Sequence, residues 1–194
     1  VISSGNKMLF GENHVTVTSV CDLQQISWGS LDVDVLIDSS GVSSNVAVAK
    51  DLTKREAVRK VVVTHSSSDV DREIILGVNT DTLKSDDAVV SSSICDANAI
   101  AHPLKWINDE FGIVGGSVTT LHPWLSYQNL VDGPSISQNN PGVVWDDFAL
   151  GRAAGESLIP KNTTALTATE KVIPEIAGKL LSFSYRIPTR VVAS

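Results

Sequence analysis

Basic side chains are scarce in this sequence. Its 15 Lys and Arg stand against 22 Asp and Glu, which gives a formal net charge of −7 at pH 7. Because a phosphate backbone is bound by clustered Lys and Arg, nucleic acid is not expected as a partner. No apolar run approaches the length that crosses a bilayer, so a membrane is not expected as a partner either.

Cysteine is equally rare, with only Cys21 and Cys95 in the chain. Two thiols far apart in sequence are typical of a reducing compartment, which predicts a cytoplasmic protein with free cysteines. No Cys, His and Asp cluster has the spacing of metal ligands, so no metal site is predicted. The first and last segments, VISSGNKMLF and RIPTRVVAS, look cut, and we expect an internal piece of a longer protein.

The first half of the sequence alternates between strand and helix patterns. Residues 33–41 are an apolar strand closed by a Ser/Gly turn, residues 43–60 have helical spacing, and residues 61–69 are a β-branched strand. This order predicts an α/β fold with a parallel sheet and a crossover helix on one face. Further strands are predicted at 73–79, at 88–93 and within residues 1–20.

The second half predicts two helices, two strands and one long irregular segment. Residues 132–152 are rich in Gly, Pro and Asn and predict an ordered loop, a kind of segment that is often functional. Pro174 is expected to kink or end the second helix. The predicted helices span 97–110 and 164–179, and the predicted strands span 117–124 and 180–188.

Cys95 lies where a predicted strand gives way to a predicted helix. Backbone N–H groups and the positive end of the helix dipole favour the thiolate at such a position. His122, at the end of a strand, is the preferred imidazole partner, because His102 is about two helical turns away from Cys95. A lone cysteine is more often a small buried residue, and a lone histidine a surface residue, so both alternatives remain open. No phosphate-binding glycine motif is present.

Ordered motifs over most of the chain resemble those of the glyceraldehyde-3-phosphate dehydrogenase family. The family's nucleophile segment S-C-T-T-N corresponds to ICDAN (94–98), its I-N-D-x-F-G-I to INDEFGI (107–113), and its T-T-V-H to TTLH (119–122). Other matches follow in family order: WGSLDVDVLIDSSGV (28–42), GVN (77–79), VDGPS (131–135), GRAA (151–154), KVIPE (171–175), GKL (178–180) and RIPT (186–189).

The resemblance implies a fold, an activity and a set of site residues. It implies the second half of a Rossmann-like nucleotide-binding domain at residues 1–94 and an α+β catalytic domain at residues 95–194. It implies an NAD- or NADP-dependent phosphorylating aldehyde dehydrogenase that acts on a phosphorylated aldehyde and inorganic phosphate. It also implies that the enzyme is a homotetramer. The implied catalytic residues are Cys95 as nucleophile and His122 as base, the substrate residues Asp96, Thr163, Thr164 and Arg186, and the cofactor residues Ser39, Gly41, Thr64 and Asn98.

The chain departs from the family pattern around the nucleophile. Ile94 replaces a serine before the cysteine, and Asp96 replaces a threonine after it. A carboxylate beside the thiol disfavours the thiolate and repels phosphate, although Asp96 also suits a helix N-terminus. Leu125 and Tyr127 stand where the family offers phosphate-binding threonines, and Thr164 stands where it has glycine. We therefore expect an altered substrate with fewer or differently placed phosphates.

Two other functions remain open from the sequence. The departures at Ile94 and Asp96 favour a non-catalytic paralogue with a structural or regulatory role, whereas Cys95, Asn98, His122 and Arg186 favour the enzyme. A thioester hydrolase or acyltransferase that uses the same Cys–His pair without a nucleotide is the third possibility. The glycine-rich first turn of the nucleotide domain is not in the sequence, so this piece alone is expected to bind dinucleotide poorly and to be inactive.

Overall fold

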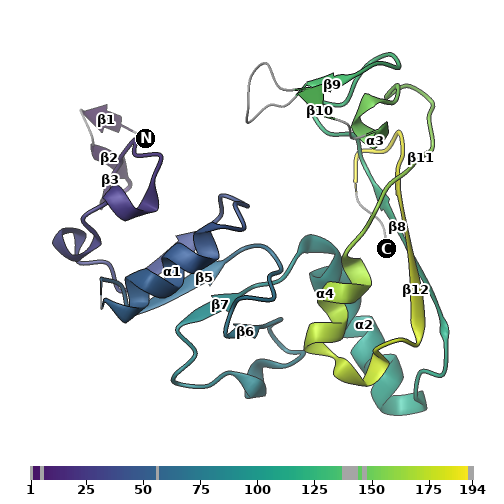
Figure 1. The fold of residues 1–194 in the computed structure, drawn as a ribbon, viewed down its shortest axis with the longest axis horizontal. Helices are drawn as coiled ribbons and strands as arrows, with labels where there is room; N and C mark the ends of the chain where they lie inside the picture. The colour runs from purple at the N-terminus through teal and green to yellow at the C-terminus, as the bar shows by residue number, and fades with distance from the viewer. Residues whose placement is uncertain (1, 5–6, 56, 137–143, 146–147, 192–194) are drawn as a thin grey trace.

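The computed structural model describes residues 2–4, 7–55, 57–136, 144–145 and 148–191 (Figure 1). A parallel sheet with a covering helix and a mixed sheet with two packed helices form its two main parts. The α/β fold class predicted from the sequence is therefore confirmed. None of the helices in these residues is long and apolar enough to cross a membrane.

The first main part is a four-stranded parallel sheet in the order β4-β5-β7-β6. Helix α1 connects β4 to β5 and lies against one face of the sheet, as Figure 1 shows. This arrangement confirms the predicted strand–helix–strand unit. The elements are β4 (Val35–Asp38), α1 (Asn45–Lys54), β5 (Lys60–Val63), β6 (Arg72–Glu73) and β7 (Val89–Ser91).

The apolar spacing of α1 explains its packing. Val46, Ala49 and Leu52 recur every three residues and are all buried, so one face of the helix is apolar. They join a core cluster that includes the fully buried Val61 and Val63 of β5. Each buried Val or Leu contributes about 1.5–3 kcal/mol of transfer free energy, and this cluster fixes the orientation of the sheet relative to α1.

The second main part packs α2 and α4 on a sheet in the order β11-β12-β8. Strands β8 and β12 are parallel over seven residues, and Figure 1 shows them as two long neighbouring arrows beside the helices. Ala97 and Ala101 of α2 and Ala168 of α4 are fully buried, and small residues at these positions let helices approach closely. The elements are α2 (Cys95–Phe111), β8 (Gly116–His122), β11 (Ile159–Pro160), α4 (Ala165–Val172) and β12 (Leu180–Arg186).

Pro174 ends helix α4, as predicted from the sequence. The helix stops at Val172, and a 3₁₀ turn, η4 (Pro174–Ile176), follows because proline has no N–H to donate to the preceding turn. Gly178 then adopts φ +72°, a left-handed conformation that glycine takes without a Cβ clash. This reversal directs the chain into β12, which carries Arg186.

The strand predicted at 73–79 is wrong beyond its first residue. Strand β6 is limited to Arg72–Glu73, and the chain then turns. The Asn79 side chain explains the turn: its Oδ1 accepts from the Ile75 N–H, and its Nδ2 donates to the Glu73 carbonyl, both at 2.9 Å. These side-chain bonds replace the strand ladder with a local turn, in which Gly77 has φ +81°.

The long segment at 132–152 is more regular than predicted. It contains β9 (Ser135–Ile136), paired antiparallel with β10 (Val144–Trp145), and a short helix, α3 (Phe148–Gly151). The Gln128 amide holds this segment by donating to the carbonyls of Ala149 and Arg152. Residues 137–143 and 146–147 of the predicted loop lie outside the described residues.

Short strands near the N-terminus are confirmed. They form an antiparallel sheet in the order β1-β2-β3, with Gly11 at φ +59° in the turn between the second and third strands. Figure 1 shows this sheet apart from both main parts. The strands are β1 (Ile2–Ser4), β2 (Lys7–Phe10) and β3 (Asn13–Thr16), and two 3₁₀ turns follow, η1 (Leu23–Gln25) and η2 (Trp28–Leu31).

Candidate active site

Cys95 is the first residue of helix α2, and its side chain is exposed. The chain reaches this position through Ser93, which has φ +64° and a buried side chain. The Ser93 hydroxyl donates to Glu73 Oε1 at 2.5 Å, which stabilises the turn between β7 and α2. Because the turn is fixed, the thiol lies at the N-terminus of the helix, as the sequence predicts.

His122 ends strand β8, and its imidazole is buried. Its neighbour across the parallel pair is Arg186, the last residue of β12. The two side chains therefore lie at the carboxyl ends of adjacent strands. Both strands were predicted from the sequence, but their pairing was not. Arg186 Nη1 donates to the Pro123 carbonyl at 3.0 Å, so the guanidinium is held beside the histidine strand.

Asp96 forms a close contact with the imidazole that the sequence did not predict. Oδ1 of Asp96 lies 3.0 Å from Nε2 of His122, and the two side chains are only 5% and 8% exposed. Neither atom has any other hydrogen-bond partner among the described residues. The carboxylate thus lies where it stabilises a protonated imidazole.

The surroundings of His122 lower the pKa of its imidazole below the ordinary value of 6.5. Burial is the largest cause, and the positive charges of Lys161 and Arg186 act in the same direction. The Asp96 carboxylate opposes them by stabilising the imidazolium. At neutral pH the imidazole is therefore uncharged and able to accept a proton.

One cavity of about 540 Å³ joins the ends of α2, β8 and β12 with the segment before α4. It brings together residues that are far apart in the sequence, and two cationic side chains and one carboxylate are among those that line it. The predicted catalytic and substrate residues all line it: Cys95, Asp96, His122, Thr163, Thr164 and Arg186.

Residues 93–194 match the family described as "Glyceraldehyde 3-phosphate dehydrogenase, C-terminal domain". The chain belongs to the glyceraldehyde-3-phosphate dehydrogenase family. A cytosolic glyceraldehyde-3-phosphate dehydrogenase of Ginkgo biloba is 38% identical over 188 residues, which are 97% of this chain and 52% of that protein. Another from Sinapis alba is 39% identical over 182 residues, 94% of this chain and 51% of the relative.

A glyceraldehyde-3-phosphate dehydrogenase of Mastigamoeba balamuthi is 39% identical over 175 residues. Those residues are 90% of this chain and 48% of that protein. The chain thus spans about half the length of the curated relatives that it matches. The resemblance inferred from the motifs is confirmed by these matches.

Lys161 is a lining residue of the cavity that the sequence analysis missed. It follows β11 and precedes the two threonines at the start of α4, and its charge acts on His122. The sequence could have indicated Lys161, because it is a cation just before a Thr–Thr pair at a strand–helix junction. Thr163 Oγ1 accepts from the Ala165 N–H at 3.1 Å, so this hydroxyl also supports the first turn of α4.

The residues predicted to bind the cofactor lie elsewhere in this glyceraldehyde-3-phosphate dehydrogenase family chain. Ser39 and Gly41 follow β4, and Thr64 follows β5. The Thr64 N–H donates to the Asp38 carbonyl at 3.0 Å. They therefore share the carboxyl edge of the parallel sheet. Asn98 differs, because its Nδ2 donates to the carbonyls of residues 92 and 94 and holds the turn before Cys95.

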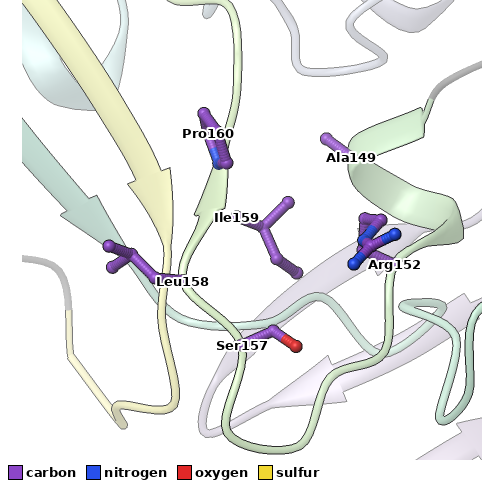
Figure 2. A pocket seen from close by; sticks show the side chains of 6 residues that line it. All are labelled: Ala149, Arg152, Ser157, Leu158, Ile159 and Pro160. Carbon is purple, nitrogen blue, oxygen red and sulfur yellow. The ribbon is translucent and has the colours of Figure 1, made fainter.

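A second cavity, of about 530 Å³, contains none of the predicted site residues. Figure 2 shows Ala149 and Arg152 on one side of it and the segment that leads into β11 on the other. Arg152 is paired with Asp132 at 3.2 Å. Within the described ranges, no three His, Cys, Asp or Glu side chains are close enough to hold a metal ion.

Proposed function

We propose that this chain carries the thiol chemistry of a glyceraldehyde-3-phosphate dehydrogenase-type enzyme. The proposal rests chiefly on the shared cavity, which places Cys95 with a buried, uncharged His122 and a cation at the end of β12. In this proposal, Cys95 is the nucleophile and His122 is the base. The substrate is an aldehyde, and a nicotinamide cofactor accepts the hydride when it is bound.

The first step forms a bond between the Cys95 sulfur and the aldehyde carbon. His122 relays the thiol proton to the carbonyl oxygen, and the product is a thiohemiacetal on the enzyme. The Cys95 N–H at the start of α2 stabilises the developing oxyanion. When the hydride leaves, His122 accepts the hydroxyl proton through its imidazole, and a thioester remains on Cys95.

The charges of the cavity favour an anionic substrate. Lys161 and Arg186 both act on His122 as positive charges, so both lie near the reacting groups. A guanidinium binds phosphate in a bidentate manner, which assigns Arg186 to the substrate phosphate. Thr163 and Thr164 supply hydroxyl groups at the start of α4, and inorganic phosphate is the second substrate of a phosphorylating enzyme of this type.

The carboxyl edge of the parallel sheet fits part of a dinucleotide. Asp38 Oδ2 is buried without a hydrogen-bond partner among the described residues, and Ser39 and Gly41 lie one and three residues after it. An orphan carboxylate oxygen at this edge suits a ribose hydroxyl, which supports the assignment of Ser39, Gly41 and Thr64 to NAD or NADP. Homotetrameric assembly and a cytosolic location, which is part of the names of several relatives, belong to the same proposal.

A dehydrogenase assay of the full-length protein tests this function. NAD or NADP reduction with glyceraldehyde 3-phosphate is expected to disappear in Cys95→Ser and to persist in Cys21→Ser, because Cys21 lies outside the cavity. Unchanged turnover in Cys95→Ser would remove the proposed nucleophile. The absence of turnover with any aldehyde and either cofactor would favour the non-catalytic alternative.

A further inference from the structure

We infer that Lys161 binds the inorganic phosphate that attacks the thioester on Cys95. The inference rests on the proposed function and concerns the step that follows hydride transfer. In this step a phosphate oxygen attacks the thioester carbon, the carbon–sulfur bond breaks, and the proton of the phosphate passes to the sulfur. The products are an acyl phosphate and the Cys95 thiol, so atoms and protons balance.

The backbone of Lys161 is held against strand β12. Its N–H donates to the Ser184 carbonyl at 2.9 Å, which continues the antiparallel pairing of β11 with β12. Residues opposite one another in such a pair point to the same face of the sheet, and so do residues two apart on one strand. The Lys161 side chain is therefore directed to the face that carries Ser184 and Arg186, and it lines the cavity of the candidate active site.

The Lys161 ammonium acts on the proposed base more strongly than the other cation of the cavity does. Its positive charge lowers the pKa of His122, and this effect exceeds that of Arg186. Because Coulomb interactions weaken with distance, Lys161 is the better placed cation for an anion that reacts beside the imidazole. The Arg186 guanidinium is held by the Pro123 carbonyl at 3.0 Å. The two cations therefore have separate tasks, Arg186 at the phosphate of the aldehyde and Lys161 at the phosphate that attacks.

The segment that follows Lys161 adds neutral donors to the same part of the cavity. Thr163 and Thr164 line the cavity directly before α4, and their hydroxyl groups can donate to phosphate oxygens. Lys161 Nζ donates to the Asn162 carbonyl at 3.5 Å, so the ammonium stays beside this segment. A lysine ammonium is a compact charge with three rotatable donors, which suits a phosphate whose geometry changes during attack.

A cation is needed in this cavity because the residue after the nucleophile is acidic. Asp96 is only 4% exposed and lines the cavity, so its charge opposes the approach of phosphate. Ile94 and Leu125 also line the cavity, and their side chains cannot donate a hydrogen bond to an anion. Lys161 offsets the Asp96 charge, and together with Arg186 it leaves the charge of the cavity lining net positive.

An acyl-enzyme made without a cofactor separates this step from hydride transfer. Full-length protein is acylated with p-nitrophenyl acetate, and acetylation of Cys95 is confirmed by peptide mass. The decay of the acetyl-enzyme is then measured at increasing phosphate concentration, and acetyl phosphate and acetate are quantified. In the wild type the rate is expected to rise with phosphate, with acetyl phosphate as the product. Because the acetyl group carries no phosphate, this response reports on the attacking phosphate alone.

Substitutions of Lys161 test its role in this response. Lys161→Gln should lower the second-order rate constant for phosphate about tenfold or more, whereas decay to water in phosphate-free buffer should change less than about twofold. Lys161→Arg keeps the charge and should retain most of the phosphate response. Lys179→Gln is the matched control, because Lys179 is exposed, precedes β12 at its other end and does not line the cavity.

Every other result overturns the inference. Wild-type decay that does not respond to phosphate removes the bound phosphate and leaves the thiol chemistry standing. Equal losses of the phosphate and water rates in Lys161→Gln would mean that the lysine acts through His122 and not on phosphate. A response that is lost in Arg186→Gln but kept in Lys161→Gln would exchange the roles of the two cations. If Cys95 is not acylated at all, the proposed nucleophile is wrong and the inference falls with it.

Discussion

The carboxylate of Asp96 lies 3.0 Å from Nε2 of His122, and both side chains are buried near the N-terminus of helix α2. This contact couples the residue after the nucleophile to the proposed base. It stabilises the protonated imidazole, whereas burial, Lys161 and Arg186 stabilise the neutral one. The protonation of His122 is thus set by opposing effects that single substitutions can separate.

Removing the charge of Asp96 should lower the pKa of His122 further. Asp96 raises this pKa in the folded protein, so Asp96→Asn leaves only the effects that lower it. The pH below which the base becomes protonated should therefore move downwards, as measured by NMR titration of the His122 ring. Asp109→Asn is the matched control, because Asp109 is on the same helix but pairs with Lys105. An upward shift in Asp96→Asn would contradict this assignment.

Stability should fall as the pH drops below the ordinary histidine range. The folded pKa of His122 lies below 6.5, so between that pKa and 6.5 the unfolded chain binds the additional proton. Stability therefore rises with pH in this window and the His122 contribution is fully present above 6.5. Urea unfolding at several pH values should show this slope in the wild type and a reduced slope in His122→Gln. Equal slopes would show that His122 does not cause it.

Glu73 should be needed for the position of Cys95 as well as for stability. Its buried carboxylate accepts from Ser93 and Ser66 and pairs with Lys171 at 3.4 Å. Glu73→Ala leaves these donors unsatisfied and should lower the free energy of unfolding by about 1–3 kcal/mol. The loss is smaller than for a fully buried ion pair because Lys171 is partly exposed. Chemical denaturation measures the cost.

The control for this cost is Asp34→Ala, which breaks an ion pair with Arg59 whose side chains are both more than half exposed. That substitution should cost less than about 1 kcal/mol. Glu73→Ala should also slow the acylation of Cys95, since Ser93 precedes the helix that carries the thiol. Equal costs for the two substitutions would show that the Glu73 cluster does not stabilise the turn.

Gly178 should resist substitution because of its backbone conformation. It has φ +72°, and a Cβ there would meet no atom within 4 Å, so the penalty of Gly178→Ala comes from the backbone alone. Gly178→Ala is expected to lower the free energy of unfolding by about 1–2 kcal/mol. Gly155 has equal space and no such φ, so Gly155→Ala is the control and should not destabilise. Thermal or urea unfolding distinguishes them, and equal stabilities would contradict the strained conformation.

Arg186 should distinguish phosphorylated from unphosphorylated aldehydes. Arg186→Gln removes a charge-assisted contact and should reduce kcat/KM for glyceraldehyde 3-phosphate about 10- to 100-fold. The value for glyceraldehyde should change much less. Arg152→Gln, in the cavity of Figure 2, should leave this preference intact. An equal loss for both aldehydes in Arg186→Gln would assign Arg186 a structural role instead.

The sequence predicted well those features that depend on local pattern. The spacing of Val46, Ala49 and Leu52 predicted α1, and the proline after Val172 predicted the end of α4. The strand beyond Glu73 was predicted wrongly, because the Asn79 side chain takes the backbone groups that a ladder would use. A side-chain bond of this kind leaves no trace in the apolar pattern.

The candidate site was predictable in its members but not in their contacts. Family motifs identified Cys95, His122 and Arg186, and the structure brings them to one cavity. The Asp96–His122 contact depends on how α2 packs against β8, which sequence spacing does not encode. Sequence reasoning therefore assigned Asp96 an effect on the thiol and on phosphate but missed its position against the imidazole.

The most direct test of the central claim is the relative alkylation rate of the two cysteines in one sample. Cys21 and Cys95 are both exposed, so access to a small reagent such as iodoacetamide is similar. The account predicts that Cys95 reacts about tenfold faster or more near neutral pH, and that His122→Gln removes most of this advantage. Equal rates in the wild type, or an advantage that survives His122→Gln, would contradict a thiol activated by this histidine.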